Sequence, residues 1–303
     1  MKKTTLTRLA RREEIGGYLL ISPWLIGFVA FLVIPIIMSI TLSFTDYDYV
    51  SKPSFVGFDN YVRALTNDPL VWHSLKITFL YTLMALPLEL SFSFGVALLL
   101  NFRGWGLNIF RTLFYLPSVL PPVAVSILWL WIFNPKFGIL NQFLGWFGID
   151  GPGWLYDPGW ALFALVVMSM WGFGRGMIVY LSGLQNINTE YYDAARVDGA
   201  NIFTTFFKIT VPLMSPVIFF NIVMGIIGSF QVFAQAFIMT GGGPANSTEF
   251  YMLYLYQNAF KFFKAGYASA LGWLLFVVIM AFSLLVIRSS SAWVYYEGEL
   301  KGR

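Results

Sequence analysis

Six long apolar runs determine what this chain can fold into. They cover residues 17–44, 75–100, 109–133, 159–184, 211–238 and 267–287. A helix needs about 20 apolar residues to cross the hydrocarbon core of a bilayer. Because lipid offers no hydrogen-bond partner to a free backbone, such runs form helices. The sequence therefore predicts an all-α polytopic membrane protein with six transmembrane helices, in one membrane domain over residues 1–303.

The composition supports this class and excludes several others. Only 11% of the residues are charged, whereas a soluble domain carries about 25%. The absence of cysteine excludes a disulfide framework, a thiolate metal site and a cysteine nucleophile. The net charge of +4 is small. Its uneven distribution fits orientation in a membrane better than nucleic-acid binding, which we do not expect.

We expect the first apolar run to be an uncleaved span, because it is long, contains Pro23 and Pro35, and shows no small-residue cleavage site.

The distribution of basic residues predicts the orientation of the chain in the membrane. Twelve Lys and Arg residues fall in the N-terminus (residues 1–16), the segments 101–111 and 185–210, and the C-terminus, against six in the opposite set of loops. The positive-inside bias therefore places both termini and segment 185–210 in the cytoplasm.

The loops expected outside are rich in aromatic and turn-forming residues. They cover residues 45–74, 134–158 and 240–266, and include the sequences NPKFG, GPGW and TGGGPANST. Such loops either present a surface to an external protein or lie in the aromatic belt at the membrane boundary.

Segment 185–210 is the longest polar interruption on the cytoplasmic side. Thr189 can cap a first helix, with Glu190 near the positive end of its dipole. We expect the helix to run over residues 191–197 and to end at Gly199 in the left-handed conformation. Asn201 can then cap a second helix.

This helix pair has two interpretations. Small residues at Ala194 and Ala195 leave a shallow spot, and Ile202, Phe206 and Ile209 share one face of the second helix. A short amphipathic pair of this kind suits docking into a groove of another protein. The alternative is a loop that lies on the bilayer.

Two charges fall midway along predicted spans, at similar depth. Glu89 lies midway along the second span and Arg175 midway along the fourth. Charges at this depth usually pair with each other or face a cavity. Either the two form an ion pair, or Arg175 faces a substrate pathway. The step from Gly172 to Gly176 suggests close helix packing around Arg175.

The fifth span combines amides with aromatic rings. Asn221, Gly228 and Gln235 fall on one helical face, with Gln231 nearby and Phe230 among the aromatic residues. Amides beside aromatic faces suit a sugar, which needs hydrogen bonds to its hydroxyls and stacking on its ring. Hydrogen bonding between helices is the alternative. The predicted substrate pathway is therefore Glu89, Arg175, Asn221, Gly228, Phe230, Gln231 and Gln235.

No catalytic or metal site is predicted. The chain contains no Gly-Lys-Ser or Gly-Lys-Thr, so a partner would have to bind any ATP. His73 is the only histidine. Without other ligands around it, we expect a structural role.

Segment 181–216 resembles the cytoplasmic coupling loop, or EAA loop, of bacterial ABC-importer permeases. The matching positions are Asp193, Ala194, Ala195, Gly199, Ile209 and Pro212. Asp193 replaces the usual Glu, and Asn188 stands where Pro is common. The resemblance implies that an ATPase docks on Tyr192, Asp193, Ala194, Ala195, Arg196, Asp198, Gly199 and Phe203.

Further stretches resemble permeases of the multiple-sugar class, with the maltose and glycerol-3-phosphate types closest. They lie at residues 20–49, 55–65, 138–149, 240–248 and 266–272. This resemblance implies a type I importer in the bacterial cell membrane. In such an importer two permease subunits, often different, form the pore. Two ATPase subunits bind ATP and Mg²⁺, and an external solute-binding protein delivers the substrate.

Other functions fit less well. A secondary transporter acting alone would need coupling residues and inverted repeats, and we find two charges midway along the spans and no repeat. A membrane enzyme would need a catalytic constellation. Within the importer interpretation the solute stays open: few charges favour a neutral mono- or oligosaccharide, while Arg175 leaves room for glycerol-3-phosphate or an acidic saccharide.

Overall fold

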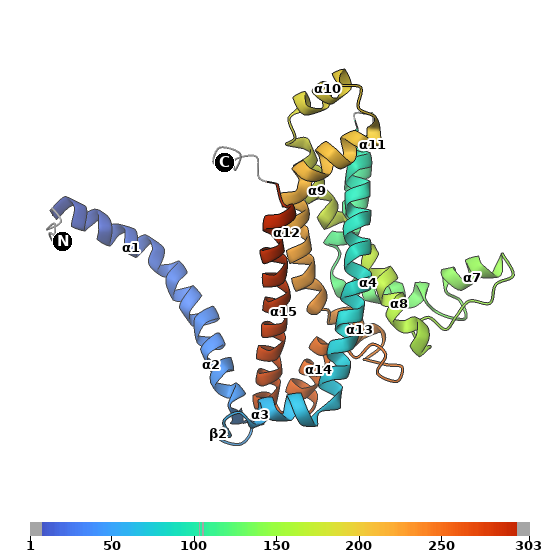
Figure 1. Ribbon diagram of the computed structural model, residues 1–303. Coiled ribbons are helices and arrows are strands. Elements are labelled where there is room, and N and C mark those ends of the chain that lie inside the picture. The colour runs from blue at the N-terminus through green and yellow to red at the C-terminus, as the bar shows by residue number, and fades with distance from the viewer. Residues whose placement is uncertain (1–7, 103, 105, 296–303) are drawn as a thin grey trace. The chain divides into compact units, whose positions relative to one another are not determined.

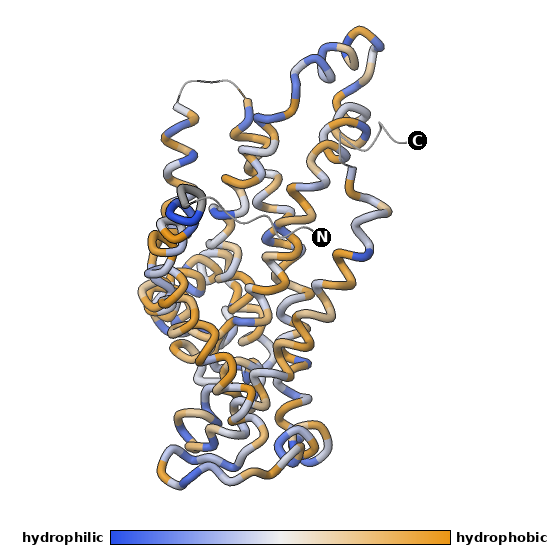
Figure 2. Tube along the Cα trace, turned by 90° about the vertical axis from the view of Figure 1, so that its left-hand side faces the viewer, coloured by the Kyte–Doolittle hydropathy of each residue, from blue (hydrophilic) through white to orange (hydrophobic). Residues whose placement is uncertain are grey.

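The computed structural model describes residues 8–102, 104 and 106–295 and is almost entirely helical (Figure 1). It divides into two compact units, Met1–Asn67 with Asn258–Trp273, and Asp68–Gln257 with Leu274–Arg303. The N-terminal expectation for residues 1–7 lies outside the described residues. Hydrophobic residues predominate along the long helices, and many hydrophilic residues gather in the connecting segments (Figure 2).

The first unit is built around one long apolar helix. Its order is α1 (Arg8–Phe28), a π-helical turn (Val29–Val33), α2 (Ile34–Ser43), β1 (Thr45–Asp46), β2 (Ser54–Phe55), α3 (Asp59–Val62) and a second π-helical turn (Arg63–Asn67). The strands pair antiparallel, with Thr45 opposite Phe55. Asn60 links α3 to the end of α2 and the start of β1, because its Nδ2 donates to the main-chain oxygens of Ser43 and Thr45 at 2.9 Å.

The second unit contains the remaining elements. They are α4 (Pro69–Leu100), α5 (Leu107–Tyr115), a 3-10 turn (Leu116–Val119), α6 (Pro122–Ile132), α7 (Ile139–Gly145), α8 (Pro158–Met170), α9 (Gly174–Gln185), α10 (Thr189–Val197), α11 (Ile202–Thr205), a π-helical turn (Phe206–Thr210), α12 (Val211–Phe230), α13 (Ala234–Met239) and α14 (Tyr251–Tyr256). The turn Gln257–Lys261 follows, and α15 (Ala265–Trp293) begins in the first unit and ends in the second.

Four helical segments, none bent by more than 40°, are long and apolar enough to cross a membrane. They are Arg11–Ser43, Pro69–Leu100, Ile202–Met239 and Ala265–Trp293. Two further pairs pass the same test but are bent, Leu107–Val119 with Pro122–Ile132 by 97° and Pro158–Met170 with Gly174–Gln185 by 43°. The described residues therefore provide four to six candidate spans.

The spans expected over residues 109–133 and 159–184 are each a pair of helices joined at a bend, and the backbone at these bends has local features. Leu120 is extended before Pro121, as proline requires of the residue that precedes it. The second bend lies at residues 171–173. Beyond it, a Cβ on Gly174 would stand 2.5 Å from the main-chain oxygen of Phe114. Glycine thus allows α9 to approach α5 closely.

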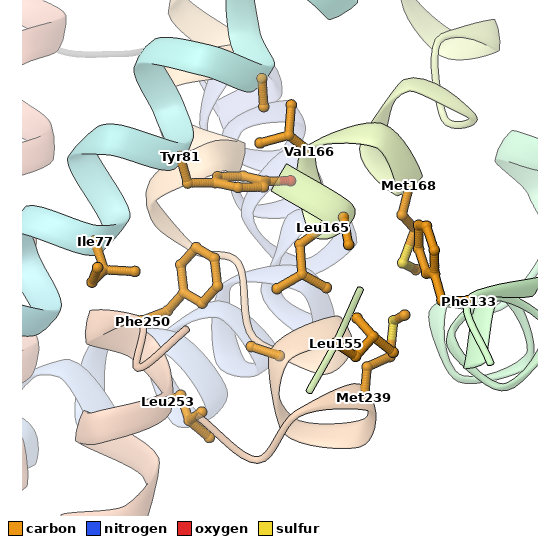
Figure 3. Close-up of a cluster of buried hydrophobic side chains, with 13 residues drawn as sticks. Ile77, Tyr81, Phe133, Leu155, Leu165, Val166, Met168, Met239, Phe250 and Leu253 are labelled. Atoms are coloured by element: carbon orange, nitrogen blue, oxygen red, sulfur yellow. The ribbon is translucent and has the colours of Figure 1, made fainter. Parts of the chain in front are cut away.

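Buried side chains of the second unit form two clusters. In the first, Tyr81 of α4 packs edge-on against Phe250 at 5.1 Å between ring centroids, with Leu165 and Val166 of α8 beside them (Figure 3). The second joins α4, α9 and α12 through residues that include Ala97, Met177, Tyr180 and Met214. These clusters fix the helices that carry the site below.

Candidate functional site

A cavity of about 700 Å³ lies among α4, the α5–α6 and α8–α9 junctions, α12 and α13. Its wall mixes apolar residues with charged, amide and hydroxyl groups. The polar side chains that line it are Tyr81, Glu89, Ser93, Ser118, Ser169, Trp171, Arg175, Asn221, Ser229, Gln231 and Gln235. A volume of this size accommodates a small organic solute.

The helix breaks build this cavity. Pro117, Ser118 and Leu120 line it from the first bend, and Trp171 and Gly172 from the second. Gln231 and Val232 line it from a third break, between α12 and α13. Irregular backbone at membrane depth is tolerated where it lines a cavity or is buried in protein. The breaks therefore place main-chain polar groups beside the cavity.

Arg175 is held by main chain and not by Glu89. Its Nε and Nη2 donate to the oxygen of Ser118 at 3.2 and 3.0 Å. No salt bridge joins the two described residues Glu89 and Arg175, so the structure does not support the alternative of an ion pair between them. The break after Ser118 explains this, because it frees a main-chain oxygen that the guanidinium can reach. Both charges line the cavity.

The amides expected along one face also reach the cavity. Asn221 donates to the main-chain oxygen of Val217 at 2.9 Å, and Gln235 donates from Nε2 to the hydroxyl of Tyr81 at 3.0 Å. Gln231 and Gly228 line the wall, and a Cβ on Gly228 would meet no atom within 4 Å. The small residue at this position thus keeps part of the cavity open.

Phe230 is the exception among the predicted pathway residues. Its side chain is 2% exposed, lies outside the cavity lining and stacks on Phe282 at 5.5 Å between ring centroids. The placement of Phe230 on the pathway is therefore wrong: it is a core residue. The expected fifth span over residues 211–238 lies within the candidate span Ile202–Met239, in which α12 ends at Phe230 and α13 begins at Ala234. Whether the lining residues contact a solute stays a prediction.

Three residues that line the cavity were not predicted from the sequence: Tyr81, Ser118 and Trp171. Tyr81 and Trp171 resemble ordinary core aromatics in an apolar run. Ser118 is brought into place by the bend at Pro121 and Pro122, and this pair of prolines was the available signal.

Helix α10 lies at one end of the second unit, beyond the ends of α4 and α9 (Figure 1). The expected cap is wrong by one residue. Asn188 caps α10, since its Oδ1 accepts from the Glu190 amide at 3.1 Å, and Thr189 is the first helical residue. Gly199 is left-handed at φ +72°, and Asn201 caps α11 by accepting from the Thr204 amide at 2.8 Å, both as predicted.

The second helix of the pair is not a separate element. From Ile202 the chain is helical through the π-helical turn into α12. Tyr192 joins α10 to this segment, because its hydroxyl lies 3.2 Å from Oγ1 of Thr210. This contact links α10 to the helical segment that continues into α12, which lines the cavity.

The surface of the loop is mixed. Asp193 and Arg196 form an exposed pair at 3.2 Å, and Asp198 caps the C-terminus of α10. Phe203 is exposed, as are Val197 and Ile202. Ala194 is exposed, whereas Ala195 is buried, so only the first contributes to a shallow surface spot.

His73 holds a loop. Its Nε2 lies 2.9 Å from the main-chain oxygen of Asn246. Among the residues that the structure covers, no three His, Cys, Asp or Glu side chains gather in a way that could hold a metal ion.

Comparisons with known proteins identify the family. The chain is 45% identical over 99% of its length, and 97% of the other chain, to the probable ABC transporter permease protein YesP of Bacillus subtilis (strain 168). It is 35% identical to the lactose transport system permease protein LacF of Rhizobium radiobacter, over 94% and 97% of the two chains.

Solved structures share the fold. A bacterial ABC transporter involved in the import of the acidic polysaccharide alginate contains a chain that matches with a TM-score of 0.83 at 24% identity, over 94% of this chain and 99% of that one. Residues 90–296 match the family described as binding-protein-dependent transport system inner membrane component. The protein is thus a transport subunit of the membrane and not an enzyme, and the chain belongs to the family of binding-protein-dependent transport system inner membrane components.

Proposed function

We propose that this chain forms half of the translocation pathway of an ATP-driven importer, and that its cargo is a sugar. The cavity carries the proposal, because it offers amides, hydroxyls and a guanidinium beside aromatic rings. Sugars are bound by this combination. The names of relatives add support, since they include permeases for lactose, trehalose/maltose and arabinooligosaccharides.

An acidic saccharide is the second candidate. Arg175 supplies a fixed positive charge at the wall, and Glu89 supplies a negative one. One relative is named for sulfoquinovosyl glycerol and one structural neighbour for alginate. Because the wall contains one group of each sign, charge alone does not select between the two solutes.

Membership of the family supports the remaining parts of the proposal. Each bent pair counts as one span in this proposal, which gives six spans with both termini in the cytoplasm. The loop of α10 and α11 then docks on a partner ATPase, which binds ATP and Mg²⁺. A second, different permease completes the pore, and an external solute-binding protein delivers the sugar. A structural neighbour was solved with a periplasmic protein that holds an alginate pentasaccharide.

Purification of the chain from its native membrane in mild detergent tests the proposal. We expect a P-loop ATPase to copurify at about two copies per chain, together with a second permease. Uptake by liposomes that contain this complex should require ATP and the binding protein. If the chain purifies alone and moves solute without ATP, it acts as a secondary transporter.

A further inference from the structure

The loop that connects α6 to α8 carries an exposed aromatic surface and contains α7 (Figure 1). Phe143 packs edge-on against Trp146 at 5.8 Å and against Phe147 at 5.2 Å between ring centroids. These rings stay 51%, 81% and 67% exposed. The exposed residues Phe137, Ile139 and Ile149 extend the surface, which we call the α7 aromatic patch.

The patch stands on a fixed polar frame. Asn141 donates from Nδ2 to the main-chain oxygens of Pro135 and Pro152 at 3.1 and 3.2 Å, and its Oδ1 accepts from Trp154 Nε1 at 2.6 Å. Trp154 in turn packs on the buried Phe133, 5.5 Å between centroids. These contacts fix the conformation of the loop, so the aromatic side chains of the patch are exposed on an ordered backbone.

A contiguous exposed apolar surface marks a site of contact with protein or membrane. Ile127, Leu128 and Trp131 are exposed on α6 just before the loop, and Trp160 and Phe163 on α8 just after it. Both helices belong to the candidate spans of a membrane protein, so their exposed apolar faces are suited to contact with lipid. Along the chain, the patch lies between these two apolar surfaces.

The chemistry also favours lipid over a soluble partner. Surfaces of transient protein interfaces are about as polar as the rest of a protein surface. The six patch residues include no charged or polar side chain, and the nearest charges, Lys136 and Asp150, flank them. A binding protein that leaves after each delivery would return the patch to water. Aromatic side chains are enriched where a membrane protein meets the lipid headgroups.

We propose that the α7 aromatic patch inserts into the boundary region of the bilayer and anchors the loop between α6 and α8 to lipid. This proposal rests on the family's membrane location and does not depend on the solute. It gives α7 a partner of defined chemistry, the phospholipid boundary. In the orientation proposed above, this boundary belongs to the outer leaflet.

The natural absence of cysteine makes the test direct. Phe143→Cys and Trp146→Cys place a single thiol in the patch, and Lys136→Cys places one on the flanking polar side as a matched control. Each full-length variant is labelled with a bimane fluorophore. It is then reconstituted with its partner subunits in phosphatidylethanolamine and phosphatidylglycerol liposomes. Quenching is measured with nitroxide-labelled phospholipids and with aqueous iodide.

We expect lipid nitroxides to quench the two patch labels several-fold more than iodide does, and the Lys136→Cys label to show the reverse. The proposal is overturned if iodide quenches the patch labels as strongly as the control. It is also overturned if the patch labels escape both quenchers, or become protected only when the solute-binding protein is added, because protein then covers the patch. Failure of transport in these liposomes would count against the proposed function. The quenching result would still test contact of the patch with lipid.

Discussion

The guanidinium of Arg175 donates two hydrogen bonds to the main-chain oxygen of Ser118, at 3.2 and 3.0 Å. Ser118 belongs to a 3-10 turn that ends where Leu120 becomes extended before Pro121. Arg175 lies in α9, so this contact joins two broken helices across the wall of the cavity. The bend removes a helical hydrogen bond from the main-chain oxygen of Ser118. The Arg175 guanidinium, a charged group at membrane depth, replaces that hydrogen bond.

The first prediction concerns the two charges of the cavity. Arg175→Lys should destabilise the protein by about 1–3 kcal/mol, because a charge-assisted contact with two donors is lost. Glu89→Gln should be neutral or stabilising, since no ion pair is broken and a charge is removed from a low-dielectric site. Thermal unfolding of the purified complex in detergent measures both. A loss of about 3–5 kcal/mol in Glu89→Gln would indicate that the two charges pair after all.

The second prediction compares a glycine that faces open space, Gly228, with a glycine at a close helix contact, Gly174. Gly228→Phe should leave thermal stability nearly unchanged, because no atom lies within 4 Å of the added Cβ, and should block uptake by filling the cavity. Gly174→Ala should lower stability by about 1–3 kcal/mol, since its Cβ would stand 2.5 Å from the main-chain oxygen of Phe114. Uptake by reconstituted liposomes, beside thermal unfolding, measures both. Normal uptake by Gly228→Phe would exclude this cavity as the pathway.

Local signals explain what could be predicted from the sequence. The apolar runs predict the helical class. Gly199 predicts the end of α10 and Asn201 predicts the start of α11, because their effects act within a few residues of the chain. The bends could not be placed, because prolines inside an apolar run are compatible with a kinked helix or a broken one. Phe230 stands two residues from Gly228, about 200° around the helix, so it lies on the opposite face from the cavity and packs on Phe282.

The third prediction tests the corrected cap of α10. Asn188→Ala should destabilise α10 by about 1 kcal/mol, because the Glu190 amide loses its side-chain acceptor. Thr189→Ala is the matched control and should have little effect, since Thr189 is the first helical residue and caps nothing. Hydrogen exchange of the α10 amides, read by mass spectrometry, reports the difference. Faster exchange in Thr189→Ala than in Asn188→Ala would contradict this assignment.

The fourth prediction tests transmission from the loop to the cavity. Ala194→Arg adds a long charged side chain to an exposed position of α10, and Gly199→Asp adds a charge at a left-handed residue. Both should uncouple ATP hydrolysis from uptake without unfolding the protein, because they alter the proposed docking surface and leave the cavity intact. Gly199→Asn is the matched control. Asparagine tolerates the left-handed conformation and adds no charge, so coupling should largely survive. ATPase activity and uptake are measured on the same reconstituted complex. Normal uptake in both charged variants, with the ATPase still bound, would place the coupling surface elsewhere on the chain.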